Sequence, residues 1–324
     1  MARFKVLLTD KIDAAGMEIL EKVAEVRFSS SLSEDALTSE ASDVDGMIVR
    51  VPAFVTRKVL ENAKRLKVVG RFGVGYENID LEAATEKGVV VTYTPGANTL
   101  SVAEHVIGLI FALAKQITQA DNAVRKQDWE MRLNYSGIEL AGKTLGLVGL
   151  GRIGTCIAGL ARGLGMSVLV FDPYVPKERA GELGVELLTL EPLLSRSDFI
   201  VICCALTDET RGLIGEKALA LLKPTAYLVN VARGPIVDEQ ALIKALRDKR
   251  IAGAALDVFE KEPPDPNNPL LKLENVILSP HIAGVAQDAS RRISVWVAED
   301  VVRVLNREPP KYPANPEVLR GDRK

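Results

Sequence analysis

The sequence GLGRIG, residues 149–154, follows the apolar run TLGLV at 144–148 and opens a segment with helical periodicity. Three glycines at its first, third and sixth positions allow a tight turn and let the backbone approach a pyrophosphate closely. The negative charge of that group is stabilised by unpaired amides and by the positive end of the helix dipole. The stretch therefore predicts a strand, a glycine turn and a helix start that together bind a dinucleotide.

The residues downstream support this prediction and indicate which dinucleotide is bound. A helical stretch at 153–164 leads to a second apolar run at 167–171, which Asp172 closes. An acidic residue at this place accepts hydrogen bonds from both adenosine ribose hydroxyls and repels a 2′-phosphate. Residues 173–176 contain no arginine that could bind such a phosphate. We therefore expect NAD, rather than NADP, as the cofactor.

The composition is that of a globular chain long enough for two domains. Hydrophobic residues make up 47% of the 324 positions, which is enough for a large core. The net charge is −2, so the charge gives no indication of binding to nucleic acid or to an acidic membrane surface. The longest uncharged apolar stretch in a helical setting, 106–114, is too short to span a membrane. Residues 4–8 lack the layout of a signal peptide. We expect a cytoplasmic protein.

The cysteines give no sign of a metal site or of a disulfide framework. Cys156, Cys203 and Cys204 have no metal-ligand spacing, and an odd number with an adjacent pair does not suit paired disulfides. We expect no metal, and we interpret these residues as small buried hydrophobic side chains.

Short β-rich runs alternate with helical patterns along most of the chain, which is typical of parallel α/β folds. In the first part the expected strands are 4–9, 25–28, 46–49, 67–71 and 89–92, and the expected helices are 14–22, 56–62 and 81–87. After the glycine turn and the strand at 167–171, the further expected strands are 186–188, 198–202, 226–229, 251–256 and 276–278. The pattern predicts two doubly wound parallel sheets.

Two long helices are expected to connect these sheets. The first begins with a capping box formed by Ser101 and Glu104. Its apolar positions on one face are Val106, Leu109, Ile110, Leu113 and Ile117. The second begins near Gln287 and returns the chain to the first sheet. We thus expect a Rossmann NAD-binding domain over 99–285, a smaller flavodoxin-like substrate domain over 1–98 and 286–324, and a cleft between them.

Three segments that follow strands of the second sheet carry reactive side chains. The reactive side chains are Arg233, the carboxylates in the segment 255–263, and His281. Ligands of doubly wound sheets bind at the carboxyl ends of the strands, where these segments meet. An arginine can hold a carboxylate in a fork, and an imidazolium supported by a carboxylate can protonate a developing alkoxide. This trio suits reduction of a 2-keto acid with hydride from a nicotinamide. The other histidine, His105, we interpret as a half-buried helix residue.

The order of the motifs GLGRIG, NVARGPIVDEQAL, ALDVFEKEP and SPHIAG, with RFGVGYENID and NTLSVAEHVIGL before them, resembles the D-isomer-specific 2-hydroxyacid dehydrogenases. The resemblance runs through nearly the whole chain and points to the phosphoglycerate dehydrogenase branch. It implies that Arg233 binds the substrate carboxylate and carbonyl and that His281 is the general acid/base. It also implies that Glu262, rather than Glu260, orients this histidine.

The resemblance implies further contacts with cofactor and substrate. Asp257 would contact the nicotinamide carboxamide, and the loop of Gly73, Val74 and Gly75 would hold the substrate through its amides. The expected cofactor-binding residues are Gly149, Gly151, Arg152, Ile153, Gly154, Asp172, Thr207, Val231, Ala232, Asp257, Ala283 and Gly284. Two departures from the family pattern, ALTDET at 205–210 and alanine at position 283, remove no reactive group.

Two arginines in the first part of the chain bear on the substrate. Arg50 closes the strand at 46–49, and Arg71 opens the loop that would hold the substrate. A second anionic group on the substrate would explain both, so 3-phosphoglycerate is the first choice and a role in serine biosynthesis follows from it. Sulfolactate, a malate-like acid, and glycerate or glyoxylate remain alternatives.

Assembly and a second class of function are also open. The polar segment around Trp129 resembles the family's dimer contact, so we expect a homodimer through the NAD-binding domain. Arg132 either reaches the partner's site or is an exposed arginine.

The alternative class of function is an NAD-sensing, co-repressor-like binding protein, against which we weigh the absence of terminal extensions. Because the chain ends at Lys324, we also expect no regulatory domain and no serine feedback.

Overall fold

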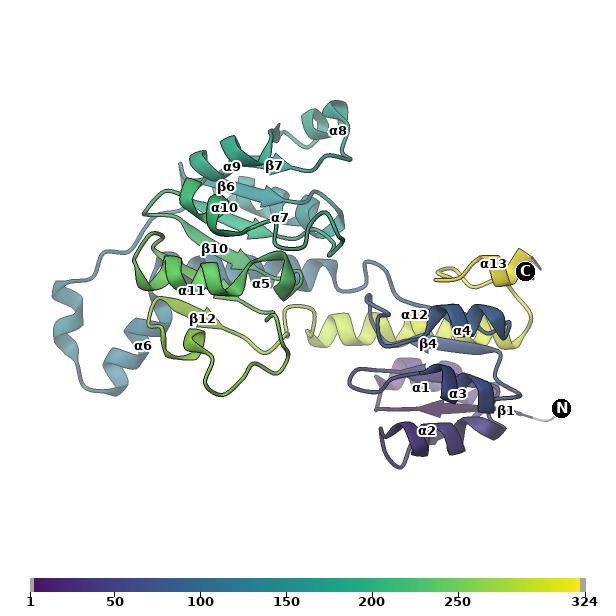
Figure 1. Ribbon diagram of the computed structural model, residues 1–324. Helices are drawn as coiled ribbons and strands as arrows, with labels where there is room; N and C mark the ends of the chain where they lie inside the picture. The colour runs from purple at the N-terminus through teal and green to yellow at the C-terminus, as the bar shows by residue number, and fades with distance from the viewer. Residues whose placement is uncertain (1–2, 321–324) are drawn as a thin grey trace. The chain divides into compact units, whose positions relative to one another are not determined.

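The computed structural model describes residues 3–320. The chain divides into two compact units (Figure 1). Unit 1 comprises Met1–Asn98 and Val285–Lys324, and unit 2 comprises Thr99–Gly284. Each unit is built around its own parallel sheet, so the expected α/β fold with two parallel sheets is confirmed.

Unit 1 contains a five-stranded parallel sheet in the order β2-β1-β3-β4-β5. This is the flavodoxin-like order 2-1-3-4-5. The strands are β1 (Phe4–Leu8), β2 (Ala24–Phe28), β3 (Gly46–Val49), β4 (Val68–Arg71) and β5 (Val90–Thr92). Buried aliphatic residues on both faces, as in β3, are what a sheet covered by helices on each side requires.

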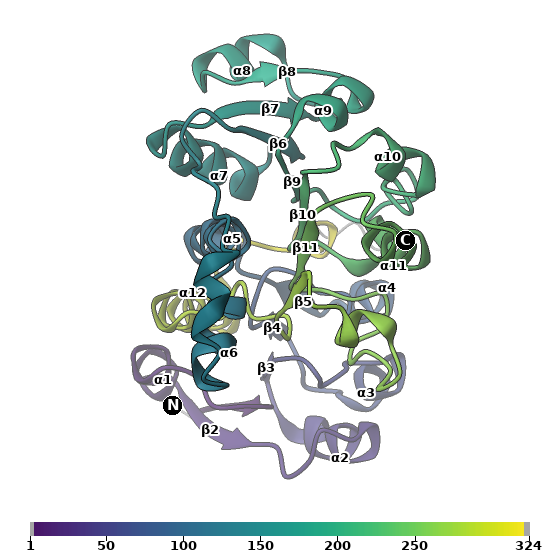
Figure 2. The same ribbon diagram turned by 90° about the vertical axis from the view of Figure 1, so that its left-hand side faces the viewer.

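Helices cover both faces of this sheet (Figure 2). One face is covered by α1 (Ala14–Glu21) and α12 (Gln287–Leu305), the other by α2 (Glu34–Glu40), α3 (Arg57–Asn62) and α4 (Leu81–Glu86). Gly70 in β4 allows the close packing of α12, because a Cβ at that position would lie 2.6 Å from Val297 and 2.8 Å from Val301. The short helix α13 (Glu317–Arg320) ends the described chain.

Unit 2 contains a seven-stranded parallel sheet in the order β12-β11-β10-β9-β6-β7-β8. Counted from β6, this is the Rossmann order 3-2-1-4-5-6 extended by a seventh strand. The strands are β6 (Thr144–Val148), β7 (Ser167–Phe171), β8 (Glu186–Leu187), β9 (Phe199–Ile202), β10 (Tyr227–Asn230), β11 (Gly253–Leu256) and β12 (Val276–Leu278).

The helices of unit 2 pack on this sheet in two layers (Figure 2). One layer contains α5 (Thr99–Ala114), α7 (Arg152–Gly163) and α8 (Lys177–Glu182). The other contains α9 (Leu190–Arg196), α10 (Glu216–Leu221) and α11 (Glu239–Arg247). The segment after α5 forms α6 (Ile117–Arg125) and the 3₁₀ turn η2 (Trp129–Leu133), and neither contains a buried residue.

The structure corrects two details expected for the first long helix. α5 begins at Thr99, so Ser101 lies inside its first turns as a buried residue and does not form a capping box with Glu104. Gln116 has a left-handed backbone with φ of 47°, which ends the helical stretch. Ile117 therefore opens a separate helix and is exposed, instead of continuing the buried face of α5.

Within residues 3–320, no single helix is long and apolar enough to cross a membrane. The pair α5 and α6 meets that test of length and composition only when taken together, and the two are bent by 60° at their junction. Most of the apolar residues of α5 are buried in the core of unit 2.

Candidate active site

The glycine turn after β6 is shaped to admit a pyrophosphate. Gly149 has φ of 105°, a conformation that favours glycine, and a Cβ on Gly154 would overlap the carbonyl of Gly149. The helix α7 begins after Gly151 without a side-chain cap, and the space beside that glycine is open. Unpaired amides at the start of a 12-residue helix therefore face an open cradle, which fits the phosphates of NAD.

Asp172 follows β7 and is held against this turn. Its Oδ2 accepts a hydrogen bond from the amide of Leu150 at 2.8 Å, and its Oδ1 accepts one from the amide of Tyr174 at 3.0 Å. The Tyr174 hydroxyl donates to Glu209 at 2.6 Å, and this hydrogen bond raises the pKa of Tyr174. Acidic oxygens at this position suit ribose hydroxyls and disfavour a 2′-phosphate.

Two cysteines at the end of β9 pack against the same turn. Cys203 Sγ donates to the Gly149 carbonyl at 3.1 Å, and a Cβ on Gly149 would lie 2.9 Å from the Cα of Cys204. Burial raises the pKa of both thiols. Cys156, Cys203 and Cys204 are each half-buried, rather than buried as the sequence suggested. Cys203 and Cys204 pack closely against the backbone of the turn.

Arg233 lies in the loop that follows β10, and local contacts fix that loop. Asn230 accepts a hydrogen bond from the Ala232 amide at 3.0 Å and donates one to the Arg233 carbonyl at 3.1 Å. The guanidinium of Arg233 donates to the Ala232 carbonyl at 2.8 Å. The next residue must be glycine, because a Cβ on Gly234 would overlap the backbone of Phe259. The loops after β10 and β11 are thereby packed together.

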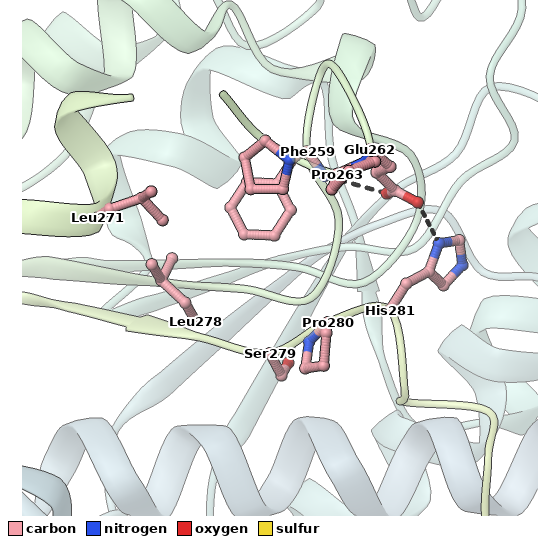
Figure 3. Close-up of a pocket in the computed structure, with 9 residues that line it drawn as sticks. Phe259, Glu262, Pro263, Leu271, Leu278, Ser279, Pro280 and His281 are labelled. Atoms are coloured by element: carbon pink, nitrogen blue, oxygen red, sulfur yellow. Dashed lines mark hydrogen bonds and ion pairs between the residues drawn. The ribbon is translucent and has the colours of Figure 1, made fainter. Parts of the chain in front are cut away.

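Glu262 and His281, in the loops that follow β11 and β12, form a close pair (Figure 3). Glu262 Oε2 lies 2.7 Å from His281 Nδ1, and its Oε1 accepts from the Phe259 amide at 3.1 Å. An ionised carboxylate can only accept, so Nδ1 is the donor. Nε2 is therefore the ring nitrogen that can exchange a proton with a substrate.

Asp257, directly after β11, has only 1% of its surface exposed. Its Oδ1 accepts from the Ser279 hydroxyl at 2.6 Å and from the Ile282 amide at 2.9 Å, and its Oδ2 accepts from the Ala283 amide at 2.9 Å. The side chain thus anchors the loop that carries His281. The expected contact of Asp257 with the nicotinamide carboxamide stays a prediction.

An apolar pocket of about 420 Å³ lies beside this pair (Figure 3). It is lined by Phe259, Glu262, Pro263, Pro264, Leu271, Leu278, Ser279, Pro280 and His281. The sequence did not indicate this pocket, because its walls come from three separate segments whose apolar residues have no common spacing. The pocket therefore places an apolar surface on one side of Glu262 and His281.

The remaining residues expected in unit 2 lie along the carboxyl edge of the same sheet. Thr207 is exposed, Val231 and Gly284 are half-buried, and Ala232 and Ala283 are buried. The ends of the neighbouring strands β10, β11 and β12 bring Arg233, Glu262 and His281 to this edge. Ser279 and Asn230, which shape the loops, were not singled out from the sequence, although each is a polar residue at a strand end.

The two arginines expected to bind substrate lie in unit 1, at the ends of the paired strands β3 and β4. The Arg50 guanidinium lies 5.2 Å from the centre of the Phe72 ring and 3.2 Å from Asp10. Arg71 donates to the Asn78 side chain at 3.1 Å. Gly73, with φ of 136°, leaves room for the Arg71 guanidinium, since a Cβ there would lie 2.7 Å from it.

Comparison with known proteins identifies the family. Residues 107–283 match the NAD binding domain of the D-isomer specific 2-hydroxyacid dehydrogenases. D-3-phosphoglycerate dehydrogenase of Methanocaldococcus jannaschii is 46% identical over 305 residues, which cover 94% of this chain and 58% of that protein. Glyoxylate reductase of Thermococcus litoralis is 40% identical, with 97% and 98% of the two chains covered. The crystal structure of the TT0316 protein from Thermus thermophilus superposes with a TM-score of 0.88 at 33% identity, covering 96% of this chain and 99% of that chain.

The fold and the matched segment define an NAD-binding protein with a Rossmann domain. The chain belongs to the D-isomer specific 2-hydroxyacid dehydrogenases. The resemblance inferred from the motifs is thereby confirmed. The chain spans 58% of the length of the Methanocaldococcus jannaschii relative.

Proposed function

We propose that the protein is an NAD-dependent oxidoreductase that interconverts a D-2-hydroxy acid and the corresponding 2-keto acid. The observation that carries this proposal is the Glu262–His281 pair, 2.7 Å apart, at the sheet edge that also holds Arg233. Such a pair can move a proton to or from a substrate oxygen.

Each residue of this set has a distinct part in the proposed reaction. When bound, NAD supplies the hydride acceptor for oxidation, and its reduced form supplies the hydride for reduction. Arg233 binds the substrate carboxylate and carbonyl through its planar fork. His281 takes the hydroxyl proton at Nε2 during oxidation and returns it during reduction. Glu262 holds Nδ1 and stabilises the imidazolium that forms.

We further propose that the substrate carries a second anionic group, with 3-phosphoglycerate as the first choice and serine biosynthesis as its setting. Arg50 and Arg71, both at the carboxyl edge of the sheet in unit 1, would bind that group. The phosphoglycerate dehydrogenase relative supports this choice. The glyoxylate reductase relative supports the alternative of a smaller acid without a second anion.

A substrate panel tests this proposal. Oxidation of 3-phosphoglycerate, sulfolactate, malate, glycerate and lactate is followed by NADH absorbance, and glyoxylate is tested in the reverse direction. We expect 3-phosphoglycerate to give the highest kcat/KM. Equal rates with glycerate or lactate would contradict the second-anion proposal, and NADH binding without turnover of any acid would favour an NAD-sensing protein.

Substitution of Arg71 tests the second anion directly. We expect Arg71→Ala to raise the KM for 3-phosphoglycerate by about 10- to 100-fold, because a charge-assisted contact is lost. The KM for NAD should stay unchanged. Arg57→Ala is the matched control, since Arg57 is a surface residue of the same unit paired with Glu86. A KM for Arg71→Ala equal to that of the control would contradict the proposed role.

We also propose that two chains pair through unit 2. The segment of α6 and η2 contains no buried residue, yet it carries large apolar side chains. Trp129 is 64% exposed and Leu133 is 74% exposed. Clustered exposed apolar groups of this kind mark protein interfaces.

A further inference from the structure

His105, on α5, is not used by the proposed chemistry, yet it contacts the loop that carries His281. Its Nε2 lies 3.3 Å from the Ser279 hydroxyl and 3.8 Å from Asp257 Oδ1. We propose that His105 is a positioning residue, which fixes Ser279 and Asp257 and thereby holds the loop 279–283 in its reactive geometry. This inference rests on the proposed role of His281.

The hydrogen-bond directions in this network follow from the number of protons available. Ser279 has a single hydroxyl proton, and its oxygen lies 2.6 Å from the Asp257 carboxylate, which only accepts. That proton therefore goes to Asp257. The hydroxyl oxygen must in turn accept from His105, so Nε2 of His105 carries a proton. The chain runs from imidazole N–H to hydroxyl to carboxylate.

Asp257 passes this constraint on to the backbone beside His281. Its side chain accepts from the amides of Ile282 and Ala283, and its carbonyl accepts from the His281 amide at 2.8 Å. His281 itself has φ of 55°, a left-handed conformation that costs free energy for a residue with a Cβ. Such a backbone persists only where its surroundings fix it, and these hydrogen bonds do so.

Loss of the His105 hydrogen bond would leave the Ser279 oxygen without its donor. The hydroxyl could then rotate away from Asp257, and the carboxylate would no longer be fixed against the loop amides. Proton transfer depends steeply on the position of the transferring group. A small displacement of the loop would therefore lower turnover, while the dinucleotide turn after β6 would stay intact.

Three substitutions at one position separate this role from simple packing. The amide nitrogen of glutamine can occupy the place of Nε2, asparagine reaches only the place of Nδ1, and leucine donates no hydrogen bond. We expect His105→Gln to keep kcat within about twofold of the wild type. We expect His105→Asn and His105→Leu to lower kcat by about 5- to 10-fold, the effect of one hydrogen bond. The Kd for NADH should stay within about threefold of the wild type in all three, because the dinucleotide turn after β6 is unchanged.

A second variant tests the path through Ser279. We expect Ser279→Ala to lower kcat as much as His105→Leu does, and the double variant to show no further loss. Any of four results would overturn the inference. The losses in the double variant could be additive, or kcat could be equal in all His105 variants. The His105→Gln variant could fail to restore kcat, or the Kd for NADH could rise in parallel with the loss of kcat.

The variant His281→Ala, measured in the same assay, distinguishes failure of the proposed function from failure of the positioning role of His105. If His281→Ala retains turnover, the proposed function fails. If it loses turnover while the His105 variants do not differ from the wild type, only the positioning role fails.

Discussion

At the scale of single residues, the site depends on side chains that shape backbone as much as on those that react. Asp257 is buried and hydrogen-bonded to the loop of His281, and Asn230 similarly fixes the loop of Arg233. Glu262 contacts the His281 ring and also fixes the backbone of its own loop, because it accepts a hydrogen bond from the Phe259 amide. We propose that these contacts hold Arg233 and His281 in place before substrate binds, so that less conformational freedom is lost during the reaction.

The thiol of Cys203 gives a prediction that depends on pH. Burial raises its pKa, so the thiol stays protonated at pH values where an unfolded cysteine ionises. We expect iodoacetamide at pH 8.5 to label Cys203 at least about tenfold more slowly in the native protein than in urea. Mass spectrometry of the labelled peptide measures both rates. A pKa that is higher in the folded than in the unfolded protein favours the fold at pH values below the pKa of the unfolded thiol. This contribution to the free energy of unfolding is lost as the pH rises above that value. Equal labelling rates would contradict the inferred burial.

The residues that could be predicted from sequence are those that follow strands. The ends of neighbouring parallel strands meet at one edge, so Arg233, Glu262 and His281 could be grouped without coordinates. His105 could not be assigned in this way. It contacts Ser279 across 174 positions of sequence, through packing of a helix on the sheet that no local pattern records.

At the scale of elements, we propose that the segment from β6 to β7 binds the dinucleotide with few polar side chains. Its glycines bring α7 close to the turn, and Asp172 accepts a hydrogen bond from the Leu150 amide beside the proposed ribose site. The helix boundaries were harder to predict than the strands. The start of α5 and its break at Gln116 depend on tertiary packing and on one left-handed residue, which override the capping pattern of Ser101.

Asp172 is expected to decide between NAD and NADP. We expect Asp172→Ala to lower the preference for NAD over NADP, measured as the ratio of kcat/KM values, by about 10- to 100-fold, because two ribose hydroxyls lose an acceptor and a 2′-phosphate is no longer repelled. Glu182→Ala, an exposed acid on α8, is the control and should keep the wild-type ratio. An unchanged ratio in Asp172→Ala would remove the assignment.

At the scale of the whole molecule, each unit holds a different set of candidate functional groups. Unit 2 holds the dinucleotide turn and the Arg233, Glu262 and His281 set, and unit 1 holds Arg50 and Arg71. Two sheets could be predicted from alternating β and α patterns. The apolar pocket beside His281 could not, because it is a product of packing between loops.

The proposed dimer is tested by its mass in solution. We expect the double variant Trp129→Glu, Leu133→Glu to behave as a monomer, because two charges would be buried in the interface. Light scattering after gel filtration measures the mass. Leu221→Glu changes another exposed leucine of unit 2 and should leave the dimer intact. A wild-type mass for the double variant would place the interface elsewhere, and a monomeric wild type would rule the dimer out.

Turnover by His281→Ala, measured together with NADH binding, tests the proposed proton transfer most directly. We predict that kcat for the best substrate of the panel falls by about 10²- to 10⁴-fold, the range lost when a general acid/base is removed. The Kd for NADH should stay within about threefold of the wild type, because the dinucleotide turn is intact. Wild-type turnover in this variant would contradict the assignment of His281 as the group that moves the proton.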